Sequence, residues 1–203
     1  KAIECPSNLD LKSVRKLKSF VVTSHTNNTK IDKDFFKTIG LFAEHHSAQK
    51  IVIPVQYRNP TIISNNADYS WDSCTHDYIL KGDLSIGKNL VISGSQRITA
   101  TAVNPLSSME ELSAGRNAIY GHPQIAMQPI PTPNSEMARF MHTTGSCNKG
   151  AYIPCKAGGK AQFHHSIGAL YVQVVGDFHY PIQLNWNGDG FHYMDEYWTV
   201  DGM

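Results

Sequence analysis

The sequence predicts an α/β protein with a mixed sheet, in which an N-terminal βαβ unit is followed by a β-rich, mostly antiparallel second half. Two short apolar runs, 19–24 and 50–55, flank a segment with helical periodicity. Later in the chain, short apolar or alternating runs are separated by Gly, Pro and Asp. With 203 residues, of which 41% are hydrophobic and 17% charged, the chain has the composition of a folded globular protein.

The βαβ unit rests on three consecutive segments. The run SFVVTS (19–24) is short, β-branched and bounded by polar residues, which is typical of a buried strand. Asp32 can accept the free N–H groups of a first helical turn, and apolar residues then recur every three or four positions over 32–47. KIVIPV (50–55) is the second strand. The two strands are expected to be parallel with a right-handed crossover.

The remaining elements are shorter. Segment 56–78 has no clean period and is expected to be irregular. Pro129 places its strand at a sheet edge, because proline cannot donate to a neighbouring strand. The sequence predicts strands over 89–95, 124–131 and 138–144, a short helix over 105–115, a hairpin of 168–176 and 178–186, and a turn with a last strand in 188–198.

The chain is expected to form a single domain, 1–203, with an α/β sub-lobe at 18–130 and a β-rich sub-lobe at 131–203. The formal net charge is only +1, so any anion site must be a local one. The four cysteines form no CxxC pair and are expected to be reduced thiols. No run of about 18 apolar residues occurs, and no membrane partner is expected.

The first candidate site is the loop TSHTNNT, which follows the first predicted strand. Loops at the carboxyl ends of parallel strands line the crevice where α/β proteins bind ligands. Ser24, Asn27 and Thr29 could therefore hold a phosphate group beside the next helix N-terminus. The alternative is a polar loop with an Asx turn and no ligand.

The second candidate site lies in HTTGSCNKGAYIPCKAGGKAQFHHSIGAL, residues 142–170. Lys156 and Lys160 flank two glycines, which are expected to form a turn whose N–H groups face an anion. His164 and His165 are expected on a strand, pointing to opposite faces. One of them could act as a general base, and Lys156 and Lys160 would bind the phosphate and stabilise negative charge. The alternative is a loop with solvated lysines and one packed histidine.

Two hydroxyl groups and two further residues complete the predicted site. Thr144 and Ser146 would position the phosphate. A divalent metal ion could assist, with Asp83 or His122 as its protein ligand. Two other arrangements stay open at this point: zinc held by His142, Cys147, Cys155 and His164, and a pair of catalytic histidines, His25 and His142, in HTN and HTT motifs like those of 2H phosphoesterases.

Several stretches occur in the order found in a family of uncharacterised tailed-bacteriophage proteins, which the chain resembles from about residue 19 to 187. They are FVVTSHTNNTKIDKDFF, IVIPVQYRNP, GRNAIYGHPQIAMQPIPTPN, TTGSCNKGAY, KAGGKAQFHHSIGALYVQV and FHYPIQLN. The resemblance implies a phage origin and a setting in the host bacterial cytoplasm or the virion. It implies no activity.

Together these features indicate a protein that acts on nucleic acid or nucleotide phosphates. The leading hypothesis is hydrolysis of a phosphodiester or phosphoester, with a histidine as general base. The first alternative is a non-catalytic DNA-binding accessory protein or virion component, whose lysines would contact phosphates. The second is a binder of small nucleotides, which would have an enclosed pocket.

Overall fold

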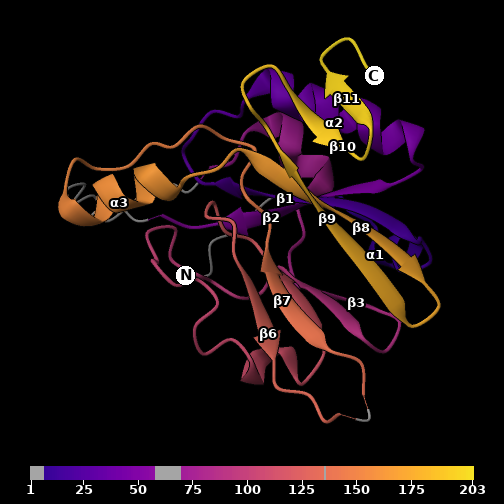
Figure 1. The fold of residues 1–203 in the computed structure, drawn as a ribbon. Coiled ribbons are helices and arrows are strands. Elements are labelled where there is room, and N and C mark those ends of the chain that lie inside the picture. Colours follow the sequence, from indigo (N-terminus) through magenta and orange to yellow (C-terminus); the bar gives the residue numbers. More distant parts are fainter. Residues whose placement is uncertain (1–6, 58–69, 135) are drawn as a thin grey trace.

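The computed structural model describes residues 7–57, 70–134 and 136–203 and confirms a mixed α/β fold. Two sheets are stacked on one another, and one long helix covers the outer face of the first sheet (Figure 1). The first sheet has the order β2-β1-β8-β9. Its strands are β1 (Ser19–Thr26), β2 (Gln49–Val55), β8 (Gly168–Val175) and β9 (Phe178–Asn185), and the covering helix is α2 (Lys33–His45).

The predicted βαβ unit is confirmed. β1 and β2 are parallel over seven residue pairs, and α2 connects them. Asp32 caps α2, since its side chain accepts a hydrogen bond from the N–H of Phe35 at 3.1 Å. β8 and β9 form the predicted antiparallel hairpin with Gly176 and Asp177 at its turn, and β8 pairs antiparallel with β1.

The second sheet has the order β3-β4-β5-β7-β6, with β4, β5 and β7 parallel to one another. β6 lies at its edge, as Pro129 predicts. The predicted helix over 105–115 is wrong: only a single 3-10 turn forms, and Ala114 and Gly115 have positive φ angles that end it. The strands are β3 (Asp83–Ile86), β4 (Leu90–Ser93), β5 (Asn117–Tyr120), β6 (Met127–Ile130) and β7 (Arg139–Thr143), and the turn is η2 (Glu111–Ser113).

Apart from α3, four further elements complete the described structure. The last predicted strand is a two-stranded hairpin that packs with α2. Residues 58–69, within the segment expected to be irregular, lie outside the described residues, and the segment ends in a 3-10 helix. No helix in the described ranges is long and apolar enough to span a bilayer. The elements are α1 (Leu11–Val14), η1 (Ser73–Tyr78), β10 (Gly190–Tyr193) and β11 (Glu196–Thr199), and α3 is described with the site.

The apolar core lies in three layers. Alternate residues of β1 explain the first two, because Val21 faces α2 whereas Phe20 and Val22 face the second sheet. The third layer covers the outer face of the second sheet, around Tyr120 and Met141. β1 is therefore buried on both faces, which accounts for the uninterrupted apolar run at 20–22.

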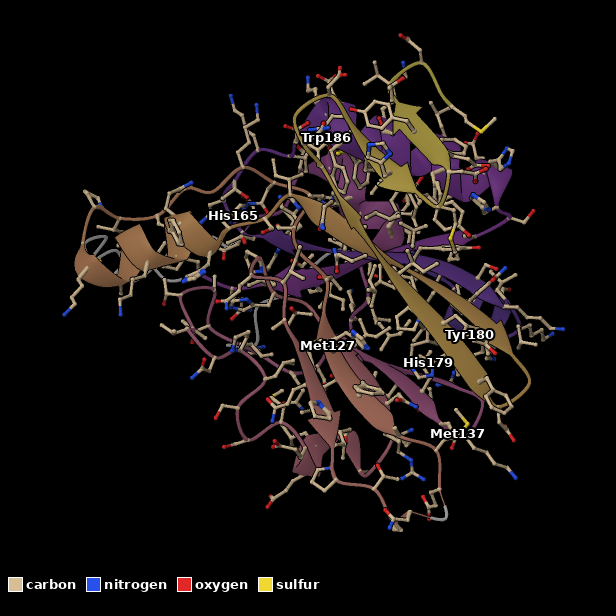
Figure 2. All side chains as sticks on the ribbon, in the orientation of Figure 1. Met127, Met137, His165, His179, Tyr180 and Trp186 are labelled. Carbon is tan, nitrogen blue, oxygen red and sulfur yellow. The ribbon has the colours of Figure 1, made fainter. Side chains whose placement is uncertain are left out.

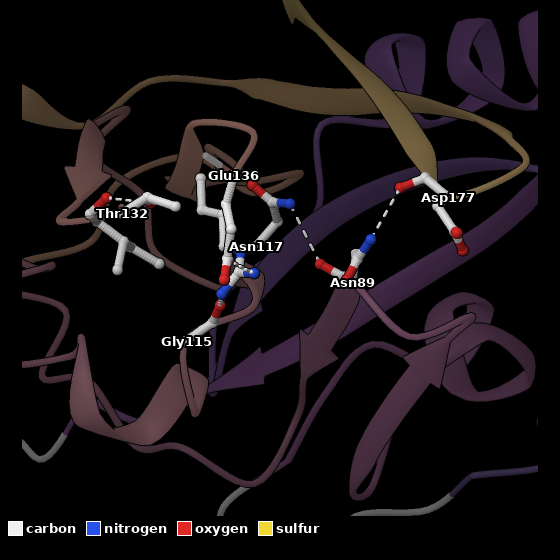
Figure 3. A network of polar contacts seen from close by, with 8 residues as sticks. Asn89, Gly115, Asn117, Thr132, Glu136 and Asp177 are labelled. Atoms are coloured by element: carbon white, nitrogen blue, oxygen red, sulfur yellow. Dashed lines mark hydrogen bonds and ion pairs between the residues drawn. The ribbon is translucent and has the colours of Figure 1, made fainter. Parts of the chain in front are cut away.

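Polar contacts attach the β8–β9 turn to the second sheet (Figure 3). The side chain of Asn89 donates to the carbonyl of Asp177 at 3.3 Å. Asn117 donates to the carbonyl of Asn89 at 3.2 Å and accepts from the N–H of Phe140 at 2.8 Å. The Asn89–Asp177 hydrogen bond thus joins the two sheets at this end, in addition to the contact between their apolar faces.

Candidate functional site

The two segments singled out in the sequence lie side by side. Beyond β7, the backbone of 144–148 runs next to the end of β1, and Ser24 forms a bridge with Ser146. The N–H of Ser24 donates to the carbonyl of Gly145 at 3.2 Å, and the N–H of Cys147 donates to the carbonyl of Ser24 at 2.8 Å. Backbone hydrogen bonds therefore join the end of β1 to the 142–170 segment, as they join neighbouring strands of a sheet.

The predicted phosphate-binding hydroxyl groups are used inside that structure. Ser24, Thr144 and Ser146 are fully buried. The Oγ of Ser24 donates to the carbonyl of Gly145 at 2.6 Å, and the Oγ of Ser146 lies 3.0 Å from the carbonyl of Ser24. These hydroxyl groups hold two backbone segments together, and in this conformation none of them faces solvent.

Asn27 and Thr29 are likewise engaged in local hydrogen bonds. The side chain of Asn27 accepts from the N–H of Tyr57 and donates to the carbonyl of Tyr57 at 3.2 Å, so it joins the ends of β1 and β2. The hydroxyl of Thr29 donates to the carbonyl of Thr26. The side chains of Asn27 and Thr29 thus bond to the protein itself, at Tyr57 and at the backbone of β1.

The predicted strand at His164 and His165 is wrong, because both residues belong to the end of a helix. α3 spans Lys156–His164, and His165 is its C-cap. Figure 1 shows α3 at the periphery, beyond the two sheets. Cys155 is the N-cap, with its Sγ accepting from the N–H of Gly158 at 3.3 Å. The glycines expected in a turn therefore lie within the helix.

His165 is held on both sides of its ring. Nε2 lies 2.6 Å from the carbonyl oxygen of Asn148, and Nδ1 lies 2.8 Å from the hydroxyl of Tyr152. A carbonyl can only accept, so Nε2 carries the proton and Nδ1 accepts from Tyr152. Burial lowers the pKa of His165, which favours this neutral form. Its lone pair is thus occupied by a protein hydroxyl group.

His164, Lys156 and Lys160 have the opposite character. All three are exposed, and their spacing of four residues places them along one face of α3. Phe163 lies beside them with 85% of its surface exposed, and its ring centroid is 5.1 Å from that of His164. We call Lys156, Lys160, Phe163 and His164 the α3 outer face. No acidic residue occurs in the helix.

The two predicted metal ligands, Asp83 and His122, lie in different parts of the fold, and each is hydrogen-bonded to other groups of the protein. Asp83, on β3, accepts hydrogen bonds from the hydroxyl groups of Ser93 and Ser95 at 2.6 and 2.8 Å. His122 Nε2 lies 3.1 Å from the carbonyl of Thr99, and its Nδ1 accepts from the N–H of Gln124 at 3.0 Å. Among residues 7–57, 70–134 and 136–203, no three His, Cys, Asp or Glu side chains form a group that could hold a metal ion.

The other histidines of the open alternatives are buried in the core. His25 is fully buried, with Nε2 3.1 Å from the carbonyl of Thr29 and Nδ1 3.3 Å from the hydroxyl of Thr75. His142 is 9% exposed on β7, and burial lowers its pKa to about 4. Cys147, of the candidate zinc set, is also fully buried. Both alternative sites would need these side chains to reach a ligand.

The structure also contains a polar cavity that the sequence analysis missed. Its volume is about 720 Å³, and it lies between the N-terminus of α2, the inner side of α3 and the end of β9. Figure 2 labels His165 and Trp186, which belong to its lining. No motif marks this cavity, because the lining residues come from five separate segments: Asp32, Asp34, Ile125, Lys149, Gly150, Gln162, His165, Ser166, Ile167, Asn185, Trp186 and Gly188.

Comparison with known proteins supports a phage origin. The chain is 28% identical over 177 residues, or 84% of its length, to Protein A1 of Escherichia phage T5. It spans 32% of the length of that protein. No protein-family model matches the chain. The similarity agrees with the resemblance to tailed-phage proteins and carries no activity with it.

Proposed function

We propose that this phage protein binds single-stranded nucleic acid through the α3 outer face. The observation that supports the proposal is an exposed phenylalanine set among cationic side chains on a peripheral helix. Phe163 is 85% exposed, and Lys156, Lys160 and His164 flank it. An exposed aromatic ring beside cationic side chains is the combination by which proteins bind single-stranded nucleic acid.

Electrostatics and spacing suit a phosphate backbone. Residues four apart on a helix are about 6 Å apart along its axis, so Lys156, Lys160 and His164 present a row of donors. Lysines that contact phosphates release counterions, and aromatic rings stack on unpaired bases whatever their sequence. Because the net charge of the whole chain is only +1, the binding must depend on this local row.

The experiment compares two pairs of lysines that have the same spacing. Lys156→Ala/Lys160→Ala removes two charges from α3, and Lys33→Ala/Lys37→Ala removes two exposed charges from α2. Binding of a fluorescent single-stranded oligonucleotide is measured from low to moderate salt. Since each phosphate contact contributes about 0.7 to the salt slope of single strands, the α3 pair should flatten the slope by about 1.4.

The α2 pair should leave the salt slope unchanged. Phe163→Ala should weaken binding about tenfold at every salt concentration, because stacking does not release counterions. DNA and RNA oligonucleotides of one sequence form parallel arms and distinguish the polymer. Equal slopes for the two lysine pairs would show that α3 is not the binding surface.

Hydrolysis of the bound phosphodiester remains a further proposal, and His164 is its candidate base. The lone pair of His165 is engaged by Tyr152, whereas His164 is exposed on the lysine-bearing face. End-labelled DNA and RNA incubated with and without Mg²⁺ would reveal cleavage. Cleavage that His164→Ala abolishes supports the proposal, and binding without cleavage under every condition removes it and leaves the non-catalytic alternative.

A further inference from the structure

We infer that the cavity behind α3 binds an unstacked nucleobase, an inference that rests on the proposed function and names its second subsite. Gln162 lies two positions from Lys160 on α3, which places the two side chains on nearly opposite sides of the helix. Gln162 lines the 720 Å³ cavity, and Lys160 does not. A strand that crosses α3 can therefore leave its phosphates on the outer face while one base reaches the inner side.

The charge of the cavity disfavours phosphate as its ligand. Asp32 and Asp34 contribute two carboxylates and Lys149 contributes one ammonium group, whose Nζ lies 3.6 Å from Asp32 Oδ2. Nε2–H of His165 donates to the carbonyl of Asn148, and burial lowers the pKa of His165. The ring is therefore neutral and adds no charge to the cavity. A net negative cavity repels anions and favours an uncharged ligand with hydrogen-bond donors.

The other lining side chains suit a planar heterocycle. Trp186 and Ile167 provide apolar surface, and Gln162, Asn185 and Ser166 provide polar groups. Gln162 and Asn185 are exposed at the cavity, so their amide groups can reach a ligand. Carboxamides pair with the edges of bases, and carboxylates accept from exocyclic amino groups. We therefore expect adenine and cytosine to be favoured over thymine and uracil.

The volume agrees with this assignment. Sites for small organic ligands occupy about 300–1,000 Å³ and combine apolar walls with a few polar groups. The cavity falls within that range. Trp186 also packs on Phe35 of α2 at 5.7 Å between ring centroids, which fixes one wall of the cavity.

The test separates the base from the phosphates. Wild-type protein is titrated with a short adenine oligonucleotide and with the same oligonucleotide carrying a central abasic site. We expect the abasic site to weaken binding about tenfold in the wild type. In Gln162→Ala/Asn185→Ala the two oligonucleotides should bind equally, with the salt slope unchanged. Both replaced side chains are exposed, so the variant should stay folded.

Phe163→Ala is the control for the alternative that the base stacks on the α3 outer face and does not enter the cavity. If the abasic penalty persists in the Gln162/Asn185 variant and disappears in Phe163→Ala, the base stacks on the outer face and the cavity inference is wrong. A second measurement needs no phosphate: adenosine and cytidine should shift the side-chain amide NMR signals of Gln162 and Asn185. Unmoved signals would overturn the inference even if oligonucleotides bind, whereas shifted signals without oligonucleotide binding would overturn only the role of the α3 outer face.

Discussion

Two adjacent histidines occupy contrasting environments. His165 is part of a hydrogen-bonded chain that runs from Tyr152 through its ring to Asn148, whose side chain accepts from the N–H of Thr26 at 2.8 Å. His164 is exposed, and its ring lies beside that of Phe163. The first histidine therefore connects the end of α3 to the end of β1, whereas the second is available to a ligand.

This contrast predicts unequal effects on stability. His165→Ala removes the hydrogen-bond partner of the Tyr152 hydroxyl and of the Asn148 carbonyl, and it should lower the free energy of unfolding by about 2–3 kcal/mol. His164→Ala should change it by less than about 0.5 kcal/mol, as exposed substitutions do. Urea unfolding followed by circular dichroism measures both values. Equal losses would contradict the assignment of His165 as the structural histidine.

His142 predicts a pH dependence of stability. Its Nε2 is buried without a hydrogen-bond partner among the described residues. Burial, with a smaller contribution from His179, lowers its pKa from 6.5 to about 4 (His179 is labelled in Figure 2). Between these values the unfolded chain binds a proton that the folded chain does not, so stability falls as the pH falls from 6.5 towards 4.

The measurement uses His142→Leu, which fills the site with an apolar side chain. Wild-type protein should lose about 3 kcal/mol more than the variant between pH 7 and 4, since each pKa unit corresponds to about 1.4 kcal/mol. Denaturant unfolding at several pH values gives both curves. Parallel curves would show that His142 titrates normally in the folded protein.

At the scale of elements, α3 depends on one close approach. A Cβ atom on Gly158 would lie 1.9 Å from the carbonyl oxygen of Ile153, whereas a Cβ on Gly159 would meet nothing within 4 Å. Gly158→Ala should therefore displace α3 and cost about 1–3 kcal/mol. Gly159→Ala should stabilise the helix by up to about 1 kcal/mol, because alanine is the better helix former.

The glycine pair also tests the proposed interface. Both variants are followed by thermal unfolding and by oligonucleotide binding at fixed salt. Gly158→Ala should weaken binding because it moves the lysines of the α3 outer face, and Gly159→Ala should preserve it. Tighter or unchanged binding by Gly158→Ala would indicate that nucleic acid contacts another surface.

The local sequence pattern predicted some elements correctly and others wrongly. The βαβ unit and the β8–β9 hairpin were predictable, because periodic apolar residues and turn residues encode them. α3 was not, because its two glycines normally indicate a turn, and the helix depends on packing against Ile153 and on capping by Cys155. The helix expected over 105–115 does not form, since Ser108, Ala114 and Gly115 have positive φ angles, while Leu106 and Met109 still pack on the second sheet.

The roles of the predicted site residues could not be read from the sequence. The rule that ligands bind at the carboxyl ends of parallel strands singled out the loop after β1, and the structure brings Ser24, near the end of that strand, beside Ser146. The rule could not show that Ser24 and Ser146 would be buried, since hydroxyl groups that bind ligands and those that bind backbone look alike in sequence. The exposure of Phe163 and the cavity beside Trp186 are tertiary features without a local signal.

At the scale of the whole molecule, the two sheets pack on one shared apolar layer, and each sheet contains strands from both halves of the sequence. β1 and β2 from the first part of the sequence pair with β8 and β9 from its end, and the second sheet also combines strands from both predicted sub-lobes, 18–130 and 131–203. We therefore expect one cooperative unfolding transition. The single-domain prediction is tested by this measurement.

Circular dichroism and tryptophan fluorescence should give the same midpoint, because the fluorescence reports the layer around α2, where Trp71 and Trp198 pack, and the circular dichroism reports all strands. A fragment covering 18–130 should not fold alone, since β1 would lose β8 on one side. Two separate midpoints, or a folded fragment, would support independent sub-lobes.

The pairing of β1 with β8 has a consequence during synthesis. Thr23 of β1 contacts Gly168 of β8 through a hydrogen bond that spans 145 residues of sequence. At about 5–20 residues per second, a ribosome takes roughly 7–30 seconds to make the intervening chain. For that time the nascent β1–β2 pair exposes one unpaired apolar edge. The nascent chain should thus bind chaperones until β8 has emerged from the exit tunnel of the ribosome.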